Sequence, residues 1–180
     1  CNYCYCKSEK FCKAMGMSKP QLKRGLWNKQ IALMIFSKEL LENLSELRQY
    51  GLFFSFSTEP MLDETFDLTL SAASIAIKEG VPVKILTKSV ENLKYIDRYS
   101  IDKELLAIGV TLTGHNELEP YASSNEDRIK ALLQFHNLGY KTFASIEPII
   151  DFESSFNMIR QTIGYCDLYM IGLEDERAYN

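Results

Sequence analysis

The chain has 180 residues, of which 46% are hydrophobic and 24% are charged, which is typical of a globular domain and excludes a disordered or fibrous chain. The 20 Lys and Arg residues against 24 Asp and Glu residues argue against a broad basic surface for nucleic acid. No run of about 18 apolar residues is present, so we expect no transmembrane helix and no membrane partner. We therefore predict a single domain over residues 1–180 in a cytoplasmic protein.

The chain begins with a cluster of cysteines, because four of its five cysteines fall within the first twelve residues. An odd, clustered set differs from the disulfide framework of small secreted domains and favours metal binding or redox chemistry. Cys1 and Cys4 are separated by two residues, so both thiolates can reach one metal ion or cluster. Zinc sites, iron–sulfur sites and redox dithiols share this spacing. A self-contained zinc site made of Cys1, Cys4, Cys6 and Cys12 is therefore an alternative.

Residues 8–50 have a helical pattern, basic in its first half, that Pro20 and Gly25 interrupt, and we expect one or two helices there. From about residue 50 onward, β-prone apolar runs alternate with amphipathic stretches. The predicted strands are residues 52–57, 81–87, 106–113, 141–146 and 168–172. The predicted helices are residues 63–79, 93–99, 125–138 and 154–163. Ser123 or Ser124 can cap the third of these helices.

Strands that alternate with helices at intervals of about 25–30 residues form βαβ units and a parallel sheet. The strand cores are nearly continuous apolar runs, as in strands covered on both faces. A doubly wound sheet and a partial barrel both fit this pattern, and in either architecture ligands bind at the carboxyl ends of the strands. Four predicted strands end in polar residues, namely Ser57-Thr58-Glu59, Thr87-Lys88-Ser89, Thr111-Leu112-Thr113 and Ser145-Ile146-Glu147.

Residues 1–5, Cys-Asn-Tyr-Cys-Tyr, resemble part of the cluster-binding loop Cys-x3-Cys-x2-Cys of the radical S-adenosylmethionine superfamily, in the branch that contains spore photoproduct lyase. Cys1 and Cys4 match the second and third cysteines of that loop. The first cysteine of the loop would lie four residues before Cys1. We therefore expect a core domain that is truncated at its N-terminus, with the C-terminus as a second candidate point of truncation.

The resemblance continues to about residue 172, through stretches similar to the third, fourth and fifth strand ends of the family. These stretches are residues 87–89, 110–113, 118–122, 126–129 and 143–150. The resemblance implies an α/β fold, a partial (β/α)6 TIM-type barrel with parallel strands. It also implies an enzyme that uses a 4Fe–4S cluster to cleave S-adenosylmethionine reductively. The resulting 5′-deoxyadenosyl radical would abstract hydrogen from an unknown substrate, with a flavodoxin- or ferredoxin-like one-electron reductant as partner.

The resemblance also implies roles for individual residues. Cys1 and Cys4 would bind the cluster, and Tyr3 and Tyr5 would lie beside it. Tyr5 would be a radical-relay or adenine-side neighbour, and Lys88 would pair with the methionine carboxylate, which makes these two the catalytic candidates.

Further positions match cofactor contacts of the family at the strand ends. They are Ser57, Thr58, Glu59, Thr111 and Thr113. The first three follow the strand after which the family contacts the methionine amino group, and the two threonines sit where it contacts the ribose. Glu119 or Arg128 would orient the site from behind these residues.

One departure from the family limits the functional prediction. Phe56 stands where spore photoproduct lyase has a hydrogen-donating cysteine, so repair of DNA lesions is not supported. The alternative function is a cysteine-rich zinc-binding or adaptor module on an α/β domain, and a (β/α) enzyme without a cluster is a third. His115 follows a strand end and is equally open to a functional or a structural role. We expect His136 to be a surface or packing residue rather than a ligand, and Cys166 to be buried as a small apolar residue.

Overall fold

The computed structural model describes residues 12–13, 28–55 and 58–173 of the chain. The strands in these ranges are β1 (Leu52–Phe54), β2 (Val83–Thr87), β3 (Leu106–Thr111), β4 (Lys141–Ile149) and β5 (Leu168–Leu173). The helices are α2 (Lys29–Glu42), α3 (Leu44–Tyr50), α4 (Phe66–Lys78), η3 (Glu91–Arg98), η4 (Lys103–Leu105), η5 (Asn116–Leu118), α5 (Asn125–Asn137) and α6 (Phe152–Thr162). None of the described helices is long and apolar enough to cross a membrane.

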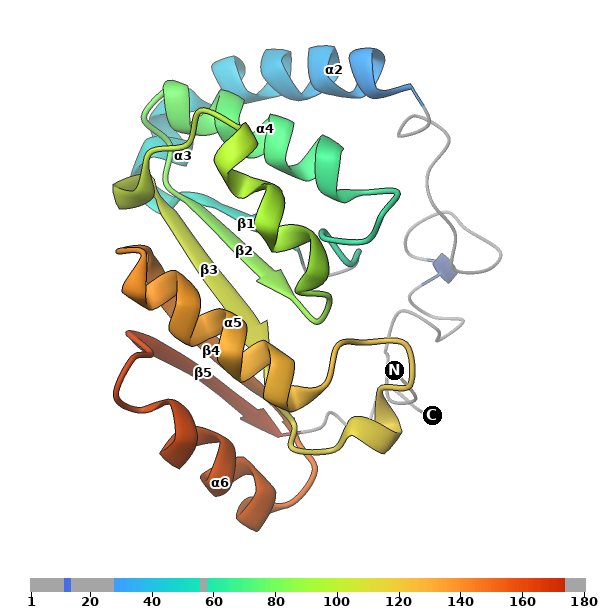
Figure 1. The fold of residues 1–180 in the computed structure, drawn as a ribbon. Coiled ribbons are helices and arrows are strands. Elements are labelled where there is room, and N and C mark those ends of the chain that lie inside the picture. Colours follow the sequence, from blue (N-terminus) through green and yellow to red (C-terminus); the bar gives the residue numbers. More distant parts are fainter. Residues whose placement is uncertain (1–11, 14–27, 56–57, 174–180) are drawn as a thin grey trace.

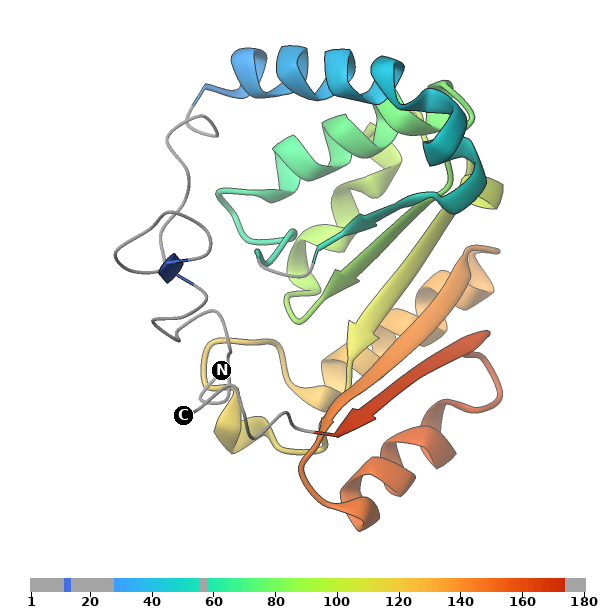
Figure 2. The same cartoon turned by 180° about the vertical axis from the view of Figure 1, so that it is seen from behind.

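The strand order decides between the two architectures that the sequence leaves open. A doubly wound sheet reverses its strand order at a switch point, whereas here the order is β1-β2-β3-β4-β5 and every neighbouring pair is parallel. Right-handed crossovers that all run in one direction place the connecting helices on one face. Figure 1 shows α5 in front of β3 and β4, and Figure 2 shows the opposite side of the sheet with β4 and β5 in front of α5.

The chain therefore forms a curled α/β half-barrel, which confirms the predicted barrel-type fold and excludes the doubly wound alternative. Among the described residues the sheet has five strands, and the sixth strand that the family resemblance implies stays a prediction.

The helix-facing side of the sheet forms an apolar core in two parts. In the first, β2 and β3 pack against α4 through Val83, Ile85, Leu106, Ile108, Leu70, Ala73, Ala76 and Ile77. In the second, β3 and β4 pack against α5 and α6 through Val110, Leu112, Ala144, Ile146, Leu132 and Met158. Because successive strand residues point to opposite faces, the residues between these core positions, Thr111 and Ser145 among them, lie on the concave side.

An aromatic ring fills the concave side where β3 and β4 pair. Phe143 is 1% exposed, and its register partner on β3 is Gly109. A Cβ atom on Gly109 would lie 2.2–2.5 Å from three atoms of the Phe143 ring, so only glycine leaves room for the ring. The ring of Phe53 on β1 lies 6.4 Å from the Phe143 ring, centroid to centroid. The two rings form an apolar layer beneath the carboxyl ends of the strands.

Capping side chains set where the helices begin, and the sequence pattern predicted only some of these caps. Ser124 accepts a backbone N–H of the first turn of α5, so it is the cap among the two predicted candidates. The helix predicted from residue 154 begins at Phe152, because Asp151 accepts the backbone N–H of Ser154. The helix predicted over residues 93–99 is a 3₁₀ helix, η3. β1 ends earlier than predicted and β4 extends further, to Ile149.

Candidate functional site

Buried polar residues gather where β3 and β4 end on the concave side. Thr111, Thr113 and Ser145 are each at most 3% exposed, and Thr111 and Ser145 are register partners. Glu119, from the loop after β3, and Arg128, from α5, are 2% and 0% exposed. Figure 1 shows this loop, in yellow, beyond the arrowhead of β3. Since burial of polar groups is unfavourable unless they are hydrogen-bonded, such a cluster needs a complete bonding network.

Arg128 supplies a large part of that network. Its Nη2 lies 2.5 Å from Oε2 of Glu119, its Nη1 donates to the Thr111 carbonyl at 2.7 Å, and its Nε donates to the Ser123 carbonyl at 2.8 Å. The hydroxyl of Thr113 donates to the same Glu119 oxygen at 3.3 Å. The guanidinium therefore ties the end of β3 to the loop that follows it, while the role of Glu119 or Arg128 in orienting a cofactor site stays a prediction.

Lys88 is held at three points just after β2. Its backbone N–H donates to Oε2 of Glu59 at 2.9 Å, and its carbonyl accepts the N–H of Ser123 at 2.9 Å. Its Nζ lies 3.8 Å from Oε1 of Glu119, and its side chain is 25% exposed. The structure thus places the ammonium of Lys88 beside the buried cluster, at the edge of the sheet where the sequence predicts it.

Glu59 joins the end of β1 to the end of β2. Besides the Lys88 N–H, its carboxylate accepts the hydroxyl of Thr87 and, at 3.3 Å, the N–H of Met61. Burial raises the pKa of Glu59 above its ordinary value, and the hydrogen bonds from Thr87 and the Lys88 backbone oppose this shift. The contacts made by Glu59 within the protein hold the two strand ends together, while its predicted contact with a methionine amino group stays a prediction.

The raised pKa of Glu59 predicts how stability varies in mild acid. The folded protein retains this proton to a higher pH than the unfolded chain, so the free energy of unfolding should fall from about pH 4.5 upward, until Glu59 is ionised in the folded state too. We expect Glu59→Gln to lack this slope in urea unfolding measured at a series of pH values. Glu64→Gln, at an exposed glutamate, should retain it, and equal slopes in the two variants would contradict the assignment.

The remaining predicted site residues differ in how they are placed. Thr58 is exposed in the loop after β1, where its N–H donates to the Ser55 hydroxyl at 3.0 Å. Thr113 is fully buried, and its hydroxyl also accepts the N–H of His115 at 3.2 Å. Cys1, Tyr3, Cys4, Tyr5, Cys6, Phe56 and Ser57 lie outside the described residues. Within the described ranges no three or more His, Cys, Asp and Glu side chains are grouped to hold a metal ion.

The structure also describes three residues to which the sequence assigned a lesser role: Cys12, Cys166 and His136. Cys12 is buried, at 3% exposure. Cys166 is only half-buried, so the expectation of a buried residue is wrong in degree, although burial does raise the pKa of its thiol. His136 is exposed on α5, as expected, with its ring 6.4 Å from that of Tyr165.

The structure adds a cluster around His115 that the sequence did not reveal. The His115 Nδ1 lies 2.7 Å from Oε1 of Glu117, and its Nε2 lies 2.5 Å from Oδ2 of Asp151 and 3.1 Å from Oγ of Ser154. Hydrogen bonds to Asp151 and then to Glu117 raise the pKa of His115. Hydrogen bonds from Ser154 and from His115 hold the pKa of Asp151 well below its usual range. The only sequence signal for the cluster is the Asp-x-x-Ser spacing of residues 151–154, which is typical of a helix cap.

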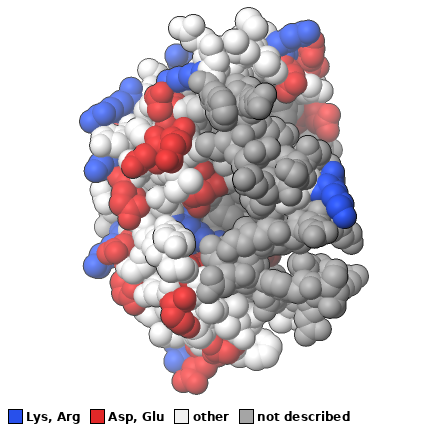
Figure 3. Space-filling model, turned by 90° about the vertical axis from the view of Figure 1, so that its right-hand side faces the viewer, with Lys and Arg blue, Asp and Glu red and all other residues white. Residues whose placement is uncertain are grey.

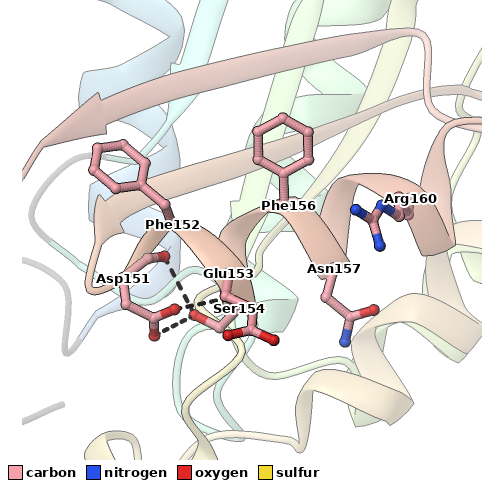
Figure 4. Close-up of a pocket in the computed structure, with 7 residues that line it drawn as sticks. All are labelled: Asp151, Phe152, Glu153, Ser154, Phe156, Asn157 and Arg160. Carbon is pink, nitrogen blue, oxygen red and sulfur yellow. Dashed lines mark hydrogen bonds between the residues drawn. The ribbon is translucent and has the colours of Figure 1, made fainter.

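A surface hollow lies beside α6, next to the end of β4. The residues lining it, shown in Figure 4, are Asp151, Phe152, Glu153, Ser154, Phe156, Asn157 and Arg160. All belong to α6 or its cap, and Phe152 and Phe156 are 71% and 60% exposed.

On the face seen in Figure 3, the described Lys and Arg residues lie singly, while several acidic residues lie together.

Comparison with known proteins adds one relative. No family model matches the chain. The chain is similar to the uncharacterized protein MJ0683 of Methanocaldococcus jannaschii, with 34% identity over 96 residues. The match covers 49% of this chain and 36% of MJ0683, so the chain matches about a third of that relative's length. The name of this relative assigns no activity.

Proposed function

We propose that the protein is a radical S-adenosylmethionine enzyme that forms a 5′-deoxyadenosyl radical for hydrogen abstraction from a substrate. The observation that supports this proposal most is that the strand ends resembling the family belong to consecutive strands of one curled parallel sheet. Glu59, Lys88 and Thr111 consequently lie at the same edge of that sheet. The Cys-x2-Cys spacing at residues 1–4 supplies thiolates of the kind that hold iron–sulfur clusters.

The residues at this edge suit the polar groups of S-adenosylmethionine. A bound 4Fe–4S cluster would supply the electron that cleaves the sulfonium, and the protein positions the molecule and excludes water. The ammonium of Lys88 is partly exposed and can pair with a carboxylate, while Glu59 fixes the backbone from which it extends. Thr111 lies on the concave side, where a hydroxyl can donate to or accept from a ribose hydroxyl. Cys1 and Cys4 would provide two of the cluster thiolates.

The test uses a form of the protein in which a cysteine stands four residues before Cys1, so that the cluster loop implied by the resemblance is complete. Anaerobic reconstitution with iron and sulfide should give a brown protein, and reductant with S-adenosylmethionine should release 5′-deoxyadenosine, measured by liquid chromatography. Cys4→Ala should lose both the colour and the product. A colourless protein that binds one zinc ion would instead establish the zinc-binding or adaptor module.

Lys88→Ala provides a separate prediction for the cofactor-binding edge. The variant should keep its cluster but bind S-adenosylmethionine roughly tenfold more weakly or worse, because a charge-assisted hydrogen bond contributes about 1.5–3 kcal/mol. The measurement is the concentration of S-adenosylmethionine that half-saturates release of 5′-deoxyadenosine. Lys78→Ala, at an exposed lysine of α4, is the matched control and should behave as the unmodified protein. Equal half-saturation in both variants would exclude Lys88 from the site.

A further inference from the structure

The imidazole of His115 connects two parts of the structure that are far apart in sequence. Glu117, at its Nδ1, belongs to the loop after β3, while Asp151 and Ser154, at its Nε2, belong to the head of α6. Figure 4 shows Asp151 and Ser154 hydrogen-bonded to each other at the first turn of α6, through the Oγ of Ser154 and the Oδ2 of Asp151 at 2.6 Å. His115 therefore attaches the loop to a helix cap that Asp151 and Ser154 form without it.

The backbone beside His115 is packed tightly against the same helix. Gly114 has a φ of +77°, and a Cβ atom at this position would lie 2.8 Å from the Cβ of Ser154. On the other side, the N–H of His115 donates to the Thr113 hydroxyl, which itself donates to Glu119. The contact with α6 is thereby continuous with the buried cluster at the end of β3.

The strength of this connection depends on the charge of the imidazole. When the ring is charged, both of its nitrogens donate, so Glu117 and Asp151 are both satisfied. A neutral ring has one N–H, so one of the two carboxylates then faces a lone pair. Glu117 is 68% exposed at its side chain and can turn to water, whereas Asp151 remains bonded to the backbone and hydroxyl of Ser154. Deprotonation therefore weakens the connection without dismantling the head of α6.

Further charged groups hold this loop through elements other than α6: Arg128 and Lys88 contact its Glu119, and Glu126 of α5 contacts its Asn116. Glu126 accepts the side-chain amide of Asn116 at 3.1 Å, and the Asn116 carbonyl oxygen accepts the backbone N–H of Asn125 at 2.7 Å. Among the described residues, Glu117 and Asp151 are the titratable groups at hydrogen-bonding distance from the His115 ring. The attachment of the loop to α5 therefore does not depend on His115, whereas its attachment to α6 does.

We propose that His115 is a pH-sensitive clamp that fastens the loop between β3 and α5 to α6, and so sets how firmly the strand-end site is held. This inference concerns regulation of the site and does not depend on the cofactor that binds there. The pKa of His115 is raised in the folded protein, so the clamp is complete below about pH 6.5 and weakens as the pH rises through the folded value, because the neutral ring keeps only one N–H.

The test is hydrogen exchange of the backbone amides of residues 114–119 as a function of pH, corrected for the intrinsic exchange rate. Protection of these amides should fall as the pH rises through the pKa of His115, by up to about tenfold for each unit by which that pKa is raised. His115→Gln should show no such dependence. Asp151→Asn should lower the pKa of His115, read from its imidazole resonances, and make the dependence shallower, while asparagine still caps α6.

Glu153→Gln is the matched control, because it removes a neighbouring carboxylate that does not contact His115. It should behave as the unmodified protein. Protection that does not vary with pH, or that falls equally in His115→Gln, would overturn the proposal. A parallel loss of protection in β3 and β4 would assign the effect to global unfolding and would also overturn it. None of these readouts requires the cluster or S-adenosylmethionine, so failure of the clamp and failure of the proposed function are distinguishable.

Discussion

Replacing Gly109 by Ala is expected to destabilise the protein by about 1–3 kcal/mol or more, since the added methyl group overpacks the concave side and the Phe143 ring must shift. The added methyl carbon would lie 2.2–2.5 Å from three ring atoms, well inside van der Waals contact, and Phe143 is 1% exposed with little room to shift. The free energy of unfolding in urea measures the effect directly.

Two further variants separate ring displacement from a general effect of alanine at a glycine position. Gly164→Ala, where nothing lies within 4 Å of the added carbon, should change stability by no more than about 0.5 kcal/mol. Combining Gly109→Ala with Phe143→Leu should cost less than the sum of the two single changes, because a smaller side chain leaves room for the methyl group. Strict additivity, or similar costs for the two glycine variants, would show that Phe143 does not pack across Gly109.

Arg128→Met is expected to destabilise the protein by about 3–5 kcal/mol, because it leaves the buried carboxylate of Glu119 without its principal partner. The same change also removes the donors to the Thr111 and Ser123 carbonyls. Urea unfolding at neutral pH measures the loss. Under the proposed function, release of 5′-deoxyadenosine should fall together with stability, because the guanidinium fastens the end of β3.

Lys130→Met is the control for this change, since Lys130 lies on the same helix with a side chain that is 76% exposed. It should alter stability by no more than about 0.5 kcal/mol. Adding Glu119→Gln to Arg128→Met should restore part of the lost stability, because a neutral amide is less costly to bury than an unpaired carboxylate. The role assigned to the pair is wrong if the added change destabilises the protein further.

The sequence predicts the fold well because its signals are local and repeated. Apolar runs such as that of residues 106–112 recur between helical stretches, and glycine at positions 80 and 139 follows two of the helices. The curl of the sheet was not readable from composition or period, since a doubly wound sheet has the same alternation. It depends on which strand pairs with which, a long-range property that only the family resemblance addressed.

The candidate site was predictable to a lesser extent. Polar residues at strand ends pointed to Glu59, Lys88, Thr111 and Thr113, because parallel strands bring their carboxyl ends together. The cluster around His115 was not predictable, since Asp151 and Ser154 lie on a helix far along the chain and meet the imidazole only through tertiary packing. The sequence prediction began this helix at residue 154 instead of Phe152, so it missed the cap at Asp151 that positions these side chains.

The Phe143 ring lying across Gly109 also limits how deep the site can be. Thr111 is two residues further along β3 than Gly109, a rise of about 6–7 Å along the strand. Because the Phe143 ring is 1% exposed and closes the concave side at that level, a molecule bound at the carboxyl edge would lie beyond the ring, level with Thr111 and Lys88.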